Sequence, residues 1–350
     1  MSSGDQAWPF VSIVIPCRNE ARYIGPCLDS ILDSDYPRDR LEIIVADGMS
    51  DDGTRDILAR YAAEHDRITM VDNPRRITPC GLNVAVHACR GETIVRMDVH
   101  AMYPSDYLPR LIRAQQETGA ENVGTMVNTL PAEETPMARA IALGLSHPLG
   151  VGNSHFRVGT STRRWVNHVP FGCWKREVFE RIGYFDEELV RGQDVEFNAR
   201  LLQQGGRILL LSEVASEYHG RRTLGQLSRM MYQYGYFKPL IARKIGKILT
   251  LRQLVPSLFV VGVTGMLLLA SGWSWARLGL ALVLSAYGLL VCLAAARNGA
   301  RLGGRGALAF SAVLPTMHWS YGLGYLQGLW DHFILPRSSR RPAAAVALSR

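Results

Sequence analysis

Residues 10–47, FVSIVIPCRNEARYIGPCLDSILDSDYPRDRLEIIVAD, carry the pattern that says most about the fold. Two short apolar runs, FVSIVIP (10–16) and LEIIVAD (41–47), are rich in β-branched residues and read as buried strands. Between them, EARYIGPCLDSIL (20–32) repeats its apolar residues at helical spacing. Parallel strands need a crossover connection, usually a helix, so we expect a parallel sheet to begin here.

The same alternation continues for another fifty residues. Helical patterns at DGTRDILARYAAEH (52–65) and CGLNVAVHAC (80–89) alternate with strand patterns at RITMVDN (67–73) and ETIVRMD (92–98). Strands that alternate with helices predict an α/β fold with a parallel sheet covered on both faces. In such sheets ligands bind at the carboxyl ends of the strands, near the point where the strand order changes.

Polar residues follow each of the four predicted strands and should therefore meet at one edge of the sheet. They are Arg18, Asn19, Glu20, Asp47, Arg75, Arg76, Asp98 and His100, with Pro16 at the end of the first run beside them. Arginines and carboxylates together suit a nucleoside diphosphate with a divalent metal, although loops are also polar without any ligand. Neither GxxxxGK[ST] nor GxGxxG follows the first strand, which excludes a P-loop ATPase and a dinucleotide-binding oxidoreductase.

Charge divides the chain into two parts. Residues 1–217 carry 23 Lys and Arg against 30 Asp and Glu, whereas residues 218–350 carry 16 against one, Asp331. A basic half indicates either nucleic acid or the cytoplasmic face of a membrane. Because these basic residues alternate with long apolar runs, we expect a membrane and no nucleic-acid partner.

Two charge-free runs in the basic half, residues 254–272 and 278–296, are each long enough to cross roughly 30 Å of hydrocarbon. We interpret them as transmembrane helices; two very apolar core helices are the alternative. A third segment, 307–330, either spans or is re-entrant, because Pro315 and His318 interrupt it. The basic flanks predict a multi-pass protein of the plasma (inner) membrane with its front domain in the cytoplasm.

The six cysteines form no CxxC pair and lie mostly in apolar runs, which indicates reduced, buried thiols rather than disulfides or a zinc site. The N-terminal sequence MSSGDQAWPF has no basic start or long apolar core, so no cleaved signal is expected.

Four blocks of the sequence resemble the GT-A domain of family 2 glycosyltransferases in both order and spacing. The resemblance is strongest to the membrane-bound succinoglycan-biosynthesis ExoA type and covers about residues 10–240. The blocks are VSIVIPCRNEARYIGPCLDSI (11–31), EIIVADGMSDDGTRDIL (42–58), GLNVAVHACRGETIVRMDVHAMYP (81–104) and FGCWKREVFERIGYFDEELVRGQDVEFNARLLQQGG (171–206).

The resemblance implies four segments and an activity. A cytosolic GT-A domain with a Rossmann-like, mostly parallel sheet (1–217) is followed by a basic juxtamembrane segment (218–252), a transmembrane region (253–335) and a basic tail (336–350). The implied reaction is an inverting, metal-dependent, non-processive transfer from a UDP-sugar to a polyprenyl-diphosphate-linked glycan for a cell-surface polysaccharide. A polyprenyl-monophosphate glycosyltransferase and an inactive nucleotide-sensing membrane protein remain as alternatives.

The resemblance also assigns the donor and metal sites. Asp194 falls on the general base, with a helix-capping acid as the alternative. Asp98 and His100 fall on the DxD motif that holds Mg²⁺ or Mn²⁺; His100 replaces the second acid. His219 matches a metal-binding histidine in some members, or lies in a surface loop. The implied donor-binding residues are Pro16, Arg18, Glu20, Asp47, Asn83 and Asp98.

The acceptor side is expected in two places. Residues 128–168 show little periodicity and predict a long functional loop, or else a disordered basic surface loop. QLSRMMYQYG (226–235) resembles the QxxRW motif of processive polymerases, but Met230 replaces its tryptophan, which favours a single addition. The residues expected at the acceptor or its diphosphate are Arg157, Arg163, Arg164, Trp165, Arg221, Arg222, Gln226 and Arg229.

Overall fold

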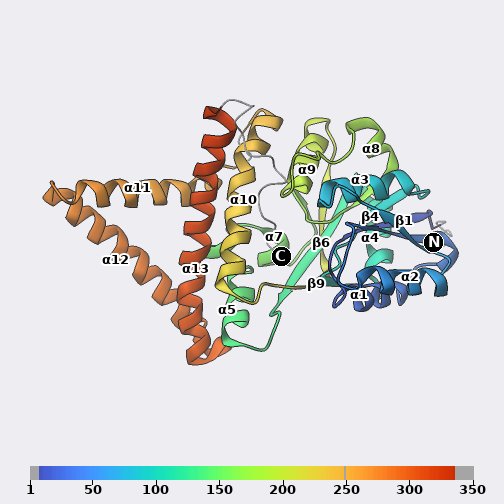
Figure 1. Cartoon of the computed structure of the whole chain (residues 1–350), viewed down its shortest axis with the longest axis horizontal. Helices are drawn as coiled ribbons and strands as arrows, with labels where there is room; N and C mark the ends of the chain where they lie inside the picture. The colour runs from blue at the N-terminus through green and yellow to red at the C-terminus, as the bar shows by residue number, and fades with distance from the viewer. Residues whose placement is uncertain (1–7, 248–249, 336–350) are drawn as a thin grey trace. The chain divides into compact units, whose positions relative to one another are not determined.

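The computed structural model describes residues 8–247 and 250–335 (Figure 1). Two compact units divide the chain. The first comprises Met1–Asn128 and Gly159–Tyr218, and the second comprises Thr129–Val158 and His219–Arg350. The basic tail expected at 336–350 lies outside the described residues.

The elements follow one another in a mixed α/β order and then as helices alone. The strands are β1 (Val11–Cys17), β2 (Leu41–Asp47), β3 (Ile68–Asp72), β4 (Thr93–Arg96), β5 (Ala101–Met102), β6 (Asn122–Leu130), β7 (Arg164–Val166), β8 (Cys173–Lys175) and β9 (Ile208–His219). The α-helices are α1 (Ile24–Leu32), α2 (Thr54–Glu64), α3 (Thr78–Ala88), α4 (Tyr107–Thr118), α5 (Pro136–Gly144), α6 (Pro148–Val151), α7 (His155–Val158), α8 (Arg176–Ile182), α9 (Gln193–Gln203), α10 (Leu224–Ile245), α11 (Val255–Leu269), α12 (Ser274–Arg297) and α13 (Gly299–Leu329). Short 3₁₀ or π turns are η1 (Arg38–Arg40), η2 (Leu251–Leu254) and η3 (Trp330–Ile334).

One mixed sheet organises the first unit. Among the described residues the strand order is β3-β2-β1-β4-β8-β6-β9-β5, with β7 also paired to β9. The strands β3, β2, β1 and β4 are parallel, as the alternation of strands and helices predicts. The pairs β4–β8, β6–β8, β5–β9 and β7–β9 are antiparallel, so the expectation of a mostly parallel sheet is corrected to a mixed sheet: the βαβ pattern stops after β4.

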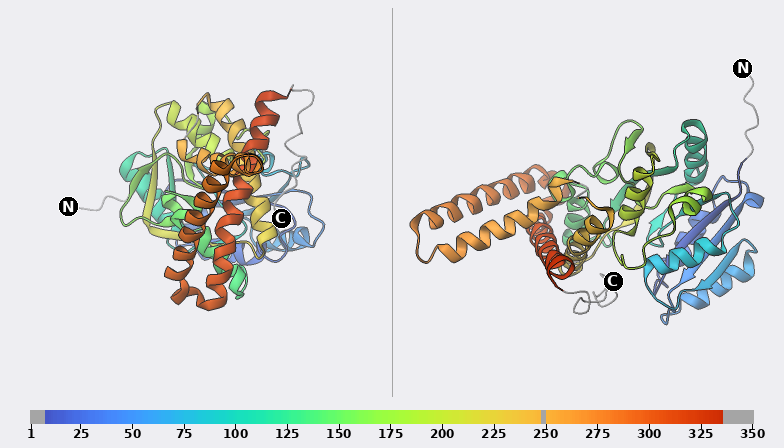
Figure 2. Two further views of the ribbon diagram at one scale, coloured as in Figure 1. Left: turned by 90° about the vertical axis from the view of Figure 1, so that its left-hand side faces the viewer. Right: turned by 90° about the horizontal axis from the view of Figure 1, so that it is seen from above.

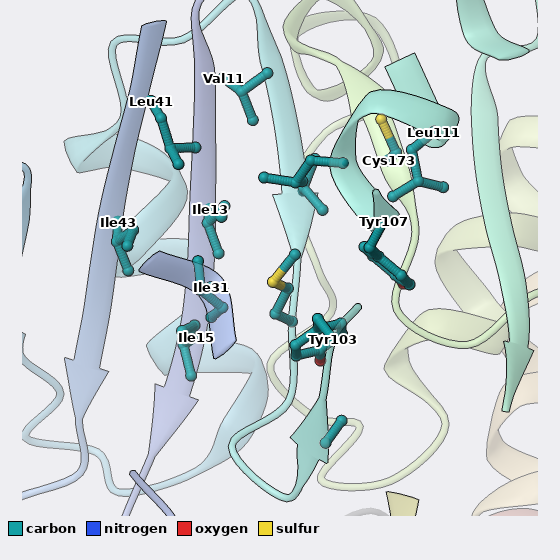
Figure 3. Packing of buried hydrophobic residues seen from close by; sticks show 14 of the residues in the cluster. Val11, Ile13, Ile15, Ile31, Leu41, Ile43, Tyr103, Tyr107, Leu111 and Cys173 are labelled. Atoms are coloured by element: carbon teal, nitrogen blue, oxygen red, sulfur yellow. The ribbon is translucent and has the colours of Figure 1, made fainter. Parts of the chain in front are cut away.

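Helices cover both faces of the parallel strands. One face of β1 and β2, which includes Ile13, Ile15 and Ile43, packs against apolar residues of α1, α2 and α4 (Figure 3). The opposite face of the same two strands lies against α3. Because successive side chains of a strand alternate between faces, strands buried on both sides are mostly apolar, as these are apart from Ser12, Glu42 and Asp47.

A buried carboxylate fixes β2 to the neighbouring strand. Glu42 Oε1 accepts hydrogen bonds from Ser12 Oγ and from the Arg90 backbone N–H, both at 2.5 Å. Its other oxygen, Oε2, accepts from Arg90 Nε at 2.9 Å. Burial works against the charged form, but these hydrogen bonds outweigh it and lower the pKa of Glu42 below its ordinary value of 4.5.

Glu42→Gln should therefore destabilise the first unit by about 1.5–3 kcal/mol at pH 7, because an amide turns a donor toward the donors of Ser12 and Arg90. A lowered pKa contributes stability above pH 4.5 that is lost as the pH falls through the lowered value. The difference from wild type should thus shrink below pH 4.5. Thermal melting in detergent at several pH values measures it, with exposed Glu64→Gln as the control. A gap that persists unchanged at low pH would contradict this account.

Residues 129–158 do not form the long loop that their weak periodicity predicts. They contain α5, α6 and α7, and they belong to the second unit rather than to the sheet domain. The reason is packing against a distant part of the chain. Ile141 and Leu145 join a buried cluster with Val313, Leu314 and Met317 of α13. The second stretch of the first unit ends at Tyr218, and the four segments expected from the sequence stay a prediction.

Helices α10 and α13 pack closely along small residues. A Cβ on Gly324 would lie 2.1 Å from the Tyr232 carbonyl oxygen, and a Cβ on Gly328 would lie 2.2 Å from that of Tyr236. Directly after α13, Asp331 accepts hydrogen bonds from Tyr236 at 3.0 Å and from Gln327 at 2.7 Å. The acid expected to stand alone in the basic half is thus a buried structural group.

Within the described residues two helices are long and apolar enough to cross a membrane: Leu251–Leu269, which includes α11, and Ser274–Arg297, which is α12. Only 17% of the apolar window of each is buried, which is unlike a core helix. They lie side by side as the two orange helices of Figure 2. This exposed pair suggests membrane association. The third segment, 307–330, lies almost entirely within α13. This helix is not among those long and apolar enough to cross a membrane.

Candidate active site

The carboxyl ends of the parallel strands meet as the sequence predicts. Cys17 at the end of β1 pairs in register with Asp47 at the end of β2, and Asp47 pairs with Asp72 at the end of β3. Asp98 follows β4 by two residues. The edge therefore gathers polar side chains from four separate parts of the sequence.

The loops after β1 and β2 are hydrogen-bonded to each other. Asn19, which has a positive φ of 54°, donates from its side chain to Asp51 at 2.9 Å and from its backbone to Ser50 at 2.8 Å. The Asp51 backbone N–H returns a bond to the Asn19 side chain at 3.1 Å. This pairing fixes the path of the chain between Pro16 and Glu20.

Asp47 is completely buried, and both of its oxygens accept hydrogen bonds within the protein. Ser50 Oγ donates to Oδ1 at 2.5 Å, and Arg55 Nη1 donates to Oδ2 at 2.6 Å. The same Arg55 nitrogen lies 2.9 Å from Asp72 Oδ1; its bonds to Asp72 and then Asp47 raise the pKa of Arg55. A hydrogen bond between Asp47 and the nucleobase of a donor would have to replace one of these bonds. Asp72 and Arg55, missed by sequence reasoning, are the more exposed groups.

The backbone of Asp98 is held by Tyr103. The Asp98 N–H donates to the Tyr103 hydroxyl at 2.7 Å, and that hydroxyl lies 3.3 Å from the Asp98 carbonyl. Burial, followed by the neighbouring Cys27, raises the pKa of Tyr103 well above its ordinary value, so the phenol stays neutral. The Asp98 side chain itself is 25% exposed. Tyr103 thus presents the Asp98 carboxylate at the sheet edge, a role that the sequence reasoning did not assign.

His100 lies between two carboxylates. Its Nδ1 lies 3.0 Å from Asp98 Oδ1, and its Nε2 lies 2.8 Å from Glu20 Oε2, although the second contact lacks hydrogen-bond geometry. The ring is 8% exposed and packs 4.9 Å from the ring of Tyr23. The histidine therefore bridges the loop after β1 to the loop after β4.

Among the residues expected to bind a divalent metal, Asp98 has the chemistry that suits one. Mg²⁺ prefers oxygen ligands and is commonly held by one or two carboxylates together with substrate phosphates, which suits Asp98. Both ring nitrogens of His100 face carboxylates, so binding of a metal by His100 would have to open one of these contacts, and its role as a ligand stays a prediction. Among the described residues no group of three or more His, Cys, Asp or Glu has metal-binding geometry.

Asp194 lies in the first turn of α9, whose N-cap is Gly192 with a φ of 79°. The position is inside the helix, so Asp194 is not the helix cap that the sequence left as an alternative. Its Oδ1 accepts from the Val195 N–H at 3.0 Å, and its side chain is 19% exposed. Oδ2 lies 3.7 Å from Nη1 of Arg96, the last residue of β4. Arg96, also missed by sequence reasoning, therefore links Asp194 to the strand that leads into Asp98.

Asn83, an expected donor-binding residue, is buried and hydrogen-bonded to the chain before α9. Its side chain is 7% exposed, donates to the Phe185 carbonyl at 2.9 Å and accepts from the Phe185 N–H at 3.0 Å. It also donates to Glu187 at 3.0 Å. Asn83 thus uses its amide to fix the segment that precedes α9, and its expected contact with the donor stays a prediction.

Of the expected acceptor residues, the first unit contains Trp165, Arg163 and Arg164. Trp165 on β7 is 50% exposed, with the Arg207 guanidinium 4.5 Å from its ring centre. Arg163 pairs with Glu117 at 2.8 Å and Glu213 at 2.6 Å. Arg163 is therefore a structural cation, whereas Trp165 presents an accessible ring.

The remaining expected residues belong to the second unit. Arg157 donates to Thr129 at 3.2 Å, and Arg222 lies 3.1 Å from Glu133. Arg221 is 5% exposed. His219, Gln226 and Arg229 lie at or beyond the end of β9 and on the first turns of α10, and the roles of this whole group remain predictions.

Comparison with known proteins shows the family of this chain. The family profile described as "Glycosyl transferase family 2" matches residues 12–183. The succinoglycan biosynthesis protein ExoA of Rhizobium meliloti is 31% identical over 275 residues, which cover 78% of this chain and 82% of that protein. A dolichyl N-acetyl-alpha-D-glucosaminyl phosphate 3-beta-D-2,3-diacetamido-2,3-dideoxy-beta-D-glucuronosyltransferase of Methanococcus voltae is 28% identical, covering 67% of this chain and 74% of that protein.

A solved structure shares the fold. The mannosyltransferase PcManGT of Pyrobaculum calidifontis, determined with GDP-Man and Mn²⁺, superposes with a TM-score of 0.61. The two sequences are 21% identical, and the match covers 93% of this chain and 89% of that one. With a mixed sheet, carboxylates at its carboxyl edge and a relative of this identity and coverage, the chain belongs to glycosyltransferase family 2 and is a glycosyltransferase with the GT-A fold.

Proposed function

We propose that the protein transfers a sugar from a UDP-sugar to a glycan carried on a polyprenyl diphosphate, in the synthesis of a cell-surface polysaccharide. The observation that carries the reaction is the pair of carboxylates on adjoining elements, Asp98 after β4 and Asp194 in the first turn of α9. The relatives named above, one in succinoglycan synthesis and one named for a dolichyl phosphate-linked sugar, support a lipid-linked acceptor.

The donor is placed along the carboxyl edge of β1, β2 and β4. Pro16, Arg18 and Glu20 line the nucleoside side, with Arg55 and Asp72 at the far end. Arg18 lies against Gly48, since a Cβ on that glycine would be only 2.9 Å from the Arg18 Cβ. Because Gly48 has no side chain, the Arg18 side chain can cross the turn after β2.

Asp194 acts as the general base. Its carboxylate removes the proton of the acceptor hydroxyl, whose oxygen bonds to the anomeric carbon while the bond from that carbon to the phosphate oxygen breaks. The nucleoside diphosphate leaves with the electron pair, and a single displacement inverts the anomeric configuration. A divalent metal bound by Asp98 would neutralise charge on the leaving diphosphate.

The exposed helices α11 and α12 are proposed to anchor the protein in the plasma (inner) membrane, with the sheet unit in the cytoplasm. Both helices leave large apolar side chains exposed, such as Leu258, Leu268 and Leu282. Trp273 and Trp275 lie at their connection and suit the interface between lipid and water. Basic residues precede the first helix and follow the second, which favours both outer ends in the cytoplasm.

The test is nucleotide release from a panel of UDP- and GDP-sugars, with purified protein, lipid extract as acceptor source, and Mn²⁺, Mg²⁺ or EDTA. We expect release from a UDP-sugar that needs both metal and lipid, with labelled sugar recovered on a diphosphate-linked glycan. Recovery of the labelled sugar on polyprenyl monophosphate would instead identify that lipid as the acceptor. Nucleotide binding without turnover for every donor would instead indicate a sensor and overturn the proposed reaction.

His100→Ala should lower turnover about tenfold without changing the Mn²⁺ concentration that gives half-maximal rate, because His100 braces Glu20 and Asp98. Misplacing a reacting group by about 1 Å can lower the rate on the order of 10²-fold. His100 fixes only part of this geometry, so the expected loss of turnover is smaller. His65→Ala is the matched control, since His65 ends α2 at the opposite edge of the sheet. A large shift in the metal requirement would show instead that His100 is a ligand.

A further inference from the structure

Arg96 is a buried cation in the interior of the first unit. Its side chain is 6% exposed, and among the described residues its Nε and Nη1 atoms have no hydrogen-bond partner. An arginine stays charged at every physiological pH. Burying a charge is costly unless it is paired, so a nearby anion is needed to compensate Arg96.

The carboxylate within ion-pair distance is that of Asp194. Its Oδ2 lies 3.7 Å from Arg96 Nη1, which is longer than a hydrogen bond but within reach of a small side-chain rotation. Catalytic hydrogen bonds are often long in the absence of substrate and shorten in the complex. Asp194 also lies at the N-terminus of the eleven-residue helix α9, where the helix dipole favours a negative charge.

Arg96 also contacts a backbone segment of unusual conformation. The Phe171 ring centre lies 5.7 Å from the Arg96 guanidinium carbon, and Phe171 adopts a φ of 62°, which is rare for a residue with a large side chain. The Arg96 N–H donates to the carbonyl of the next residue, Gly172, at 2.9 Å. Arg96 therefore contacts both Phe171 and Asp194, in a place where backbone strain is often associated with function.

We propose that Arg96 is the positioning residue of the base: its guanidinium holds Asp194 Oδ2 while the Val195 N–H holds Oδ1, so that the carboxylate faces the acceptor hydroxyl. This inference rests on the proposed role of Asp194 as the general base. Arg96 needs no contact with the donor for this role. It acts on the rate of proton removal and leaves the binding of the nucleotide unchanged.

The test compares Arg96→Gln, Arg96→Lys, Asp194→Asn and the double variant Arg96→Gln/Asp194→Asn. Arg96→Gln should lower kcat about 10–100-fold with the donor KM within about twofold of wild type, and Arg96→Lys should recover part of the loss because it restores the charge. In the double variant, Arg96→Gln should add nothing to the loss caused by Asp194→Asn. Arg181→Gln, which breaks a surface pair with Glu121, is the control and should retain wild-type turnover.

Each other outcome separates this inference from the proposed function. Wild-type kcat in Arg96→Gln, or a further loss in the double variant, would overturn the positioning role and leave the base assignment standing. Wild-type turnover in Asp194→Asn would overturn the base assignment itself. Titration with UDP checks folding: if neither Arg96→Gln nor Arg96→Lys binds UDP, Arg96 is a structural residue and the inference is wrong.

Discussion

Asp194→Asn should lower kcat by about 10²–10⁴-fold while the affinity for UDP stays at the wild-type value. A sugar hydroxyl is a weak nucleophile, and proton removal by a positioned carboxylate contributes an acceleration of this size. Asparagine keeps the shape and the bond from the Val195 N–H but cannot accept the proton. Steady-state nucleotide release and UDP titration measure the two quantities.

The matched control for this variant is Asp56→Asn. Asp56 is also an acid in the first turn of a helix, α2, and it is exposed to solvent. Both substitutions remove a charge that the helix dipole favours, by about 0.3–1 kcal/mol. Only Asp194→Asn should affect turnover, and an equal loss in both variants would show that the effect comes from helix stability.

Asp98→Asn should lower metal-dependent turnover on the order of 10²–10³-fold, the usual size of losing one electrostatic contact to a developing charge. The half-maximal Mn²⁺ concentration should rise, because an amide oxygen is a weaker ligand than a carboxylate. Tyr103 holds the backbone of residue 98 through the main chain, so the loop should keep its position in the variant. Turnover measured against Mn²⁺ concentration gives both values.

Asp106→Asn is the control for this second substitution. Asp106 precedes α4 and pairs with Arg110 at 2.5 Å, with both side chains more than 40% exposed. Exposed ion pairs contribute little stability, so this variant should behave as wild type. An Asp98→Asn protein with unchanged turnover and unchanged metal requirement would remove Asp98 from the metal site.

The first four strands and the helices between them could be predicted because each has a local signal. The run at 41–47 forms β2 with the predicted bounds, and the ends of β1, β2 and β3 meet because parallel strands share a direction. Residues 129–158 could not be predicted, since α5 is defined by its packing against α13, about 170 residues further along the chain.

The candidate site divides in the same way. Asp98 and Asp194 were assigned to the site through motifs, which record the chemistry that a position supplies, and their roles stay predictions. Arg55, Arg96 and Tyr103 belong to no motif, because their partners are distant in the sequence or are backbone atoms. Asn83 was assigned to the donor by resemblance, yet its amide is used by the Phe185 backbone.

The sequence by itself determined the parallel half of the sheet, the edge that carries the polar side chains, the family and the two apolar runs. These follow from periodicity and from motifs, which are local properties of the chain. Only the tertiary structure decided that Asp47 is buried beneath Ser50 and Arg55, that His100 bridges Glu20 and Asp98, and that Arg96 faces Asp194. Such contacts depend on which side chains the folded strands and helices bring within a few ångströms, and no local pattern encodes them.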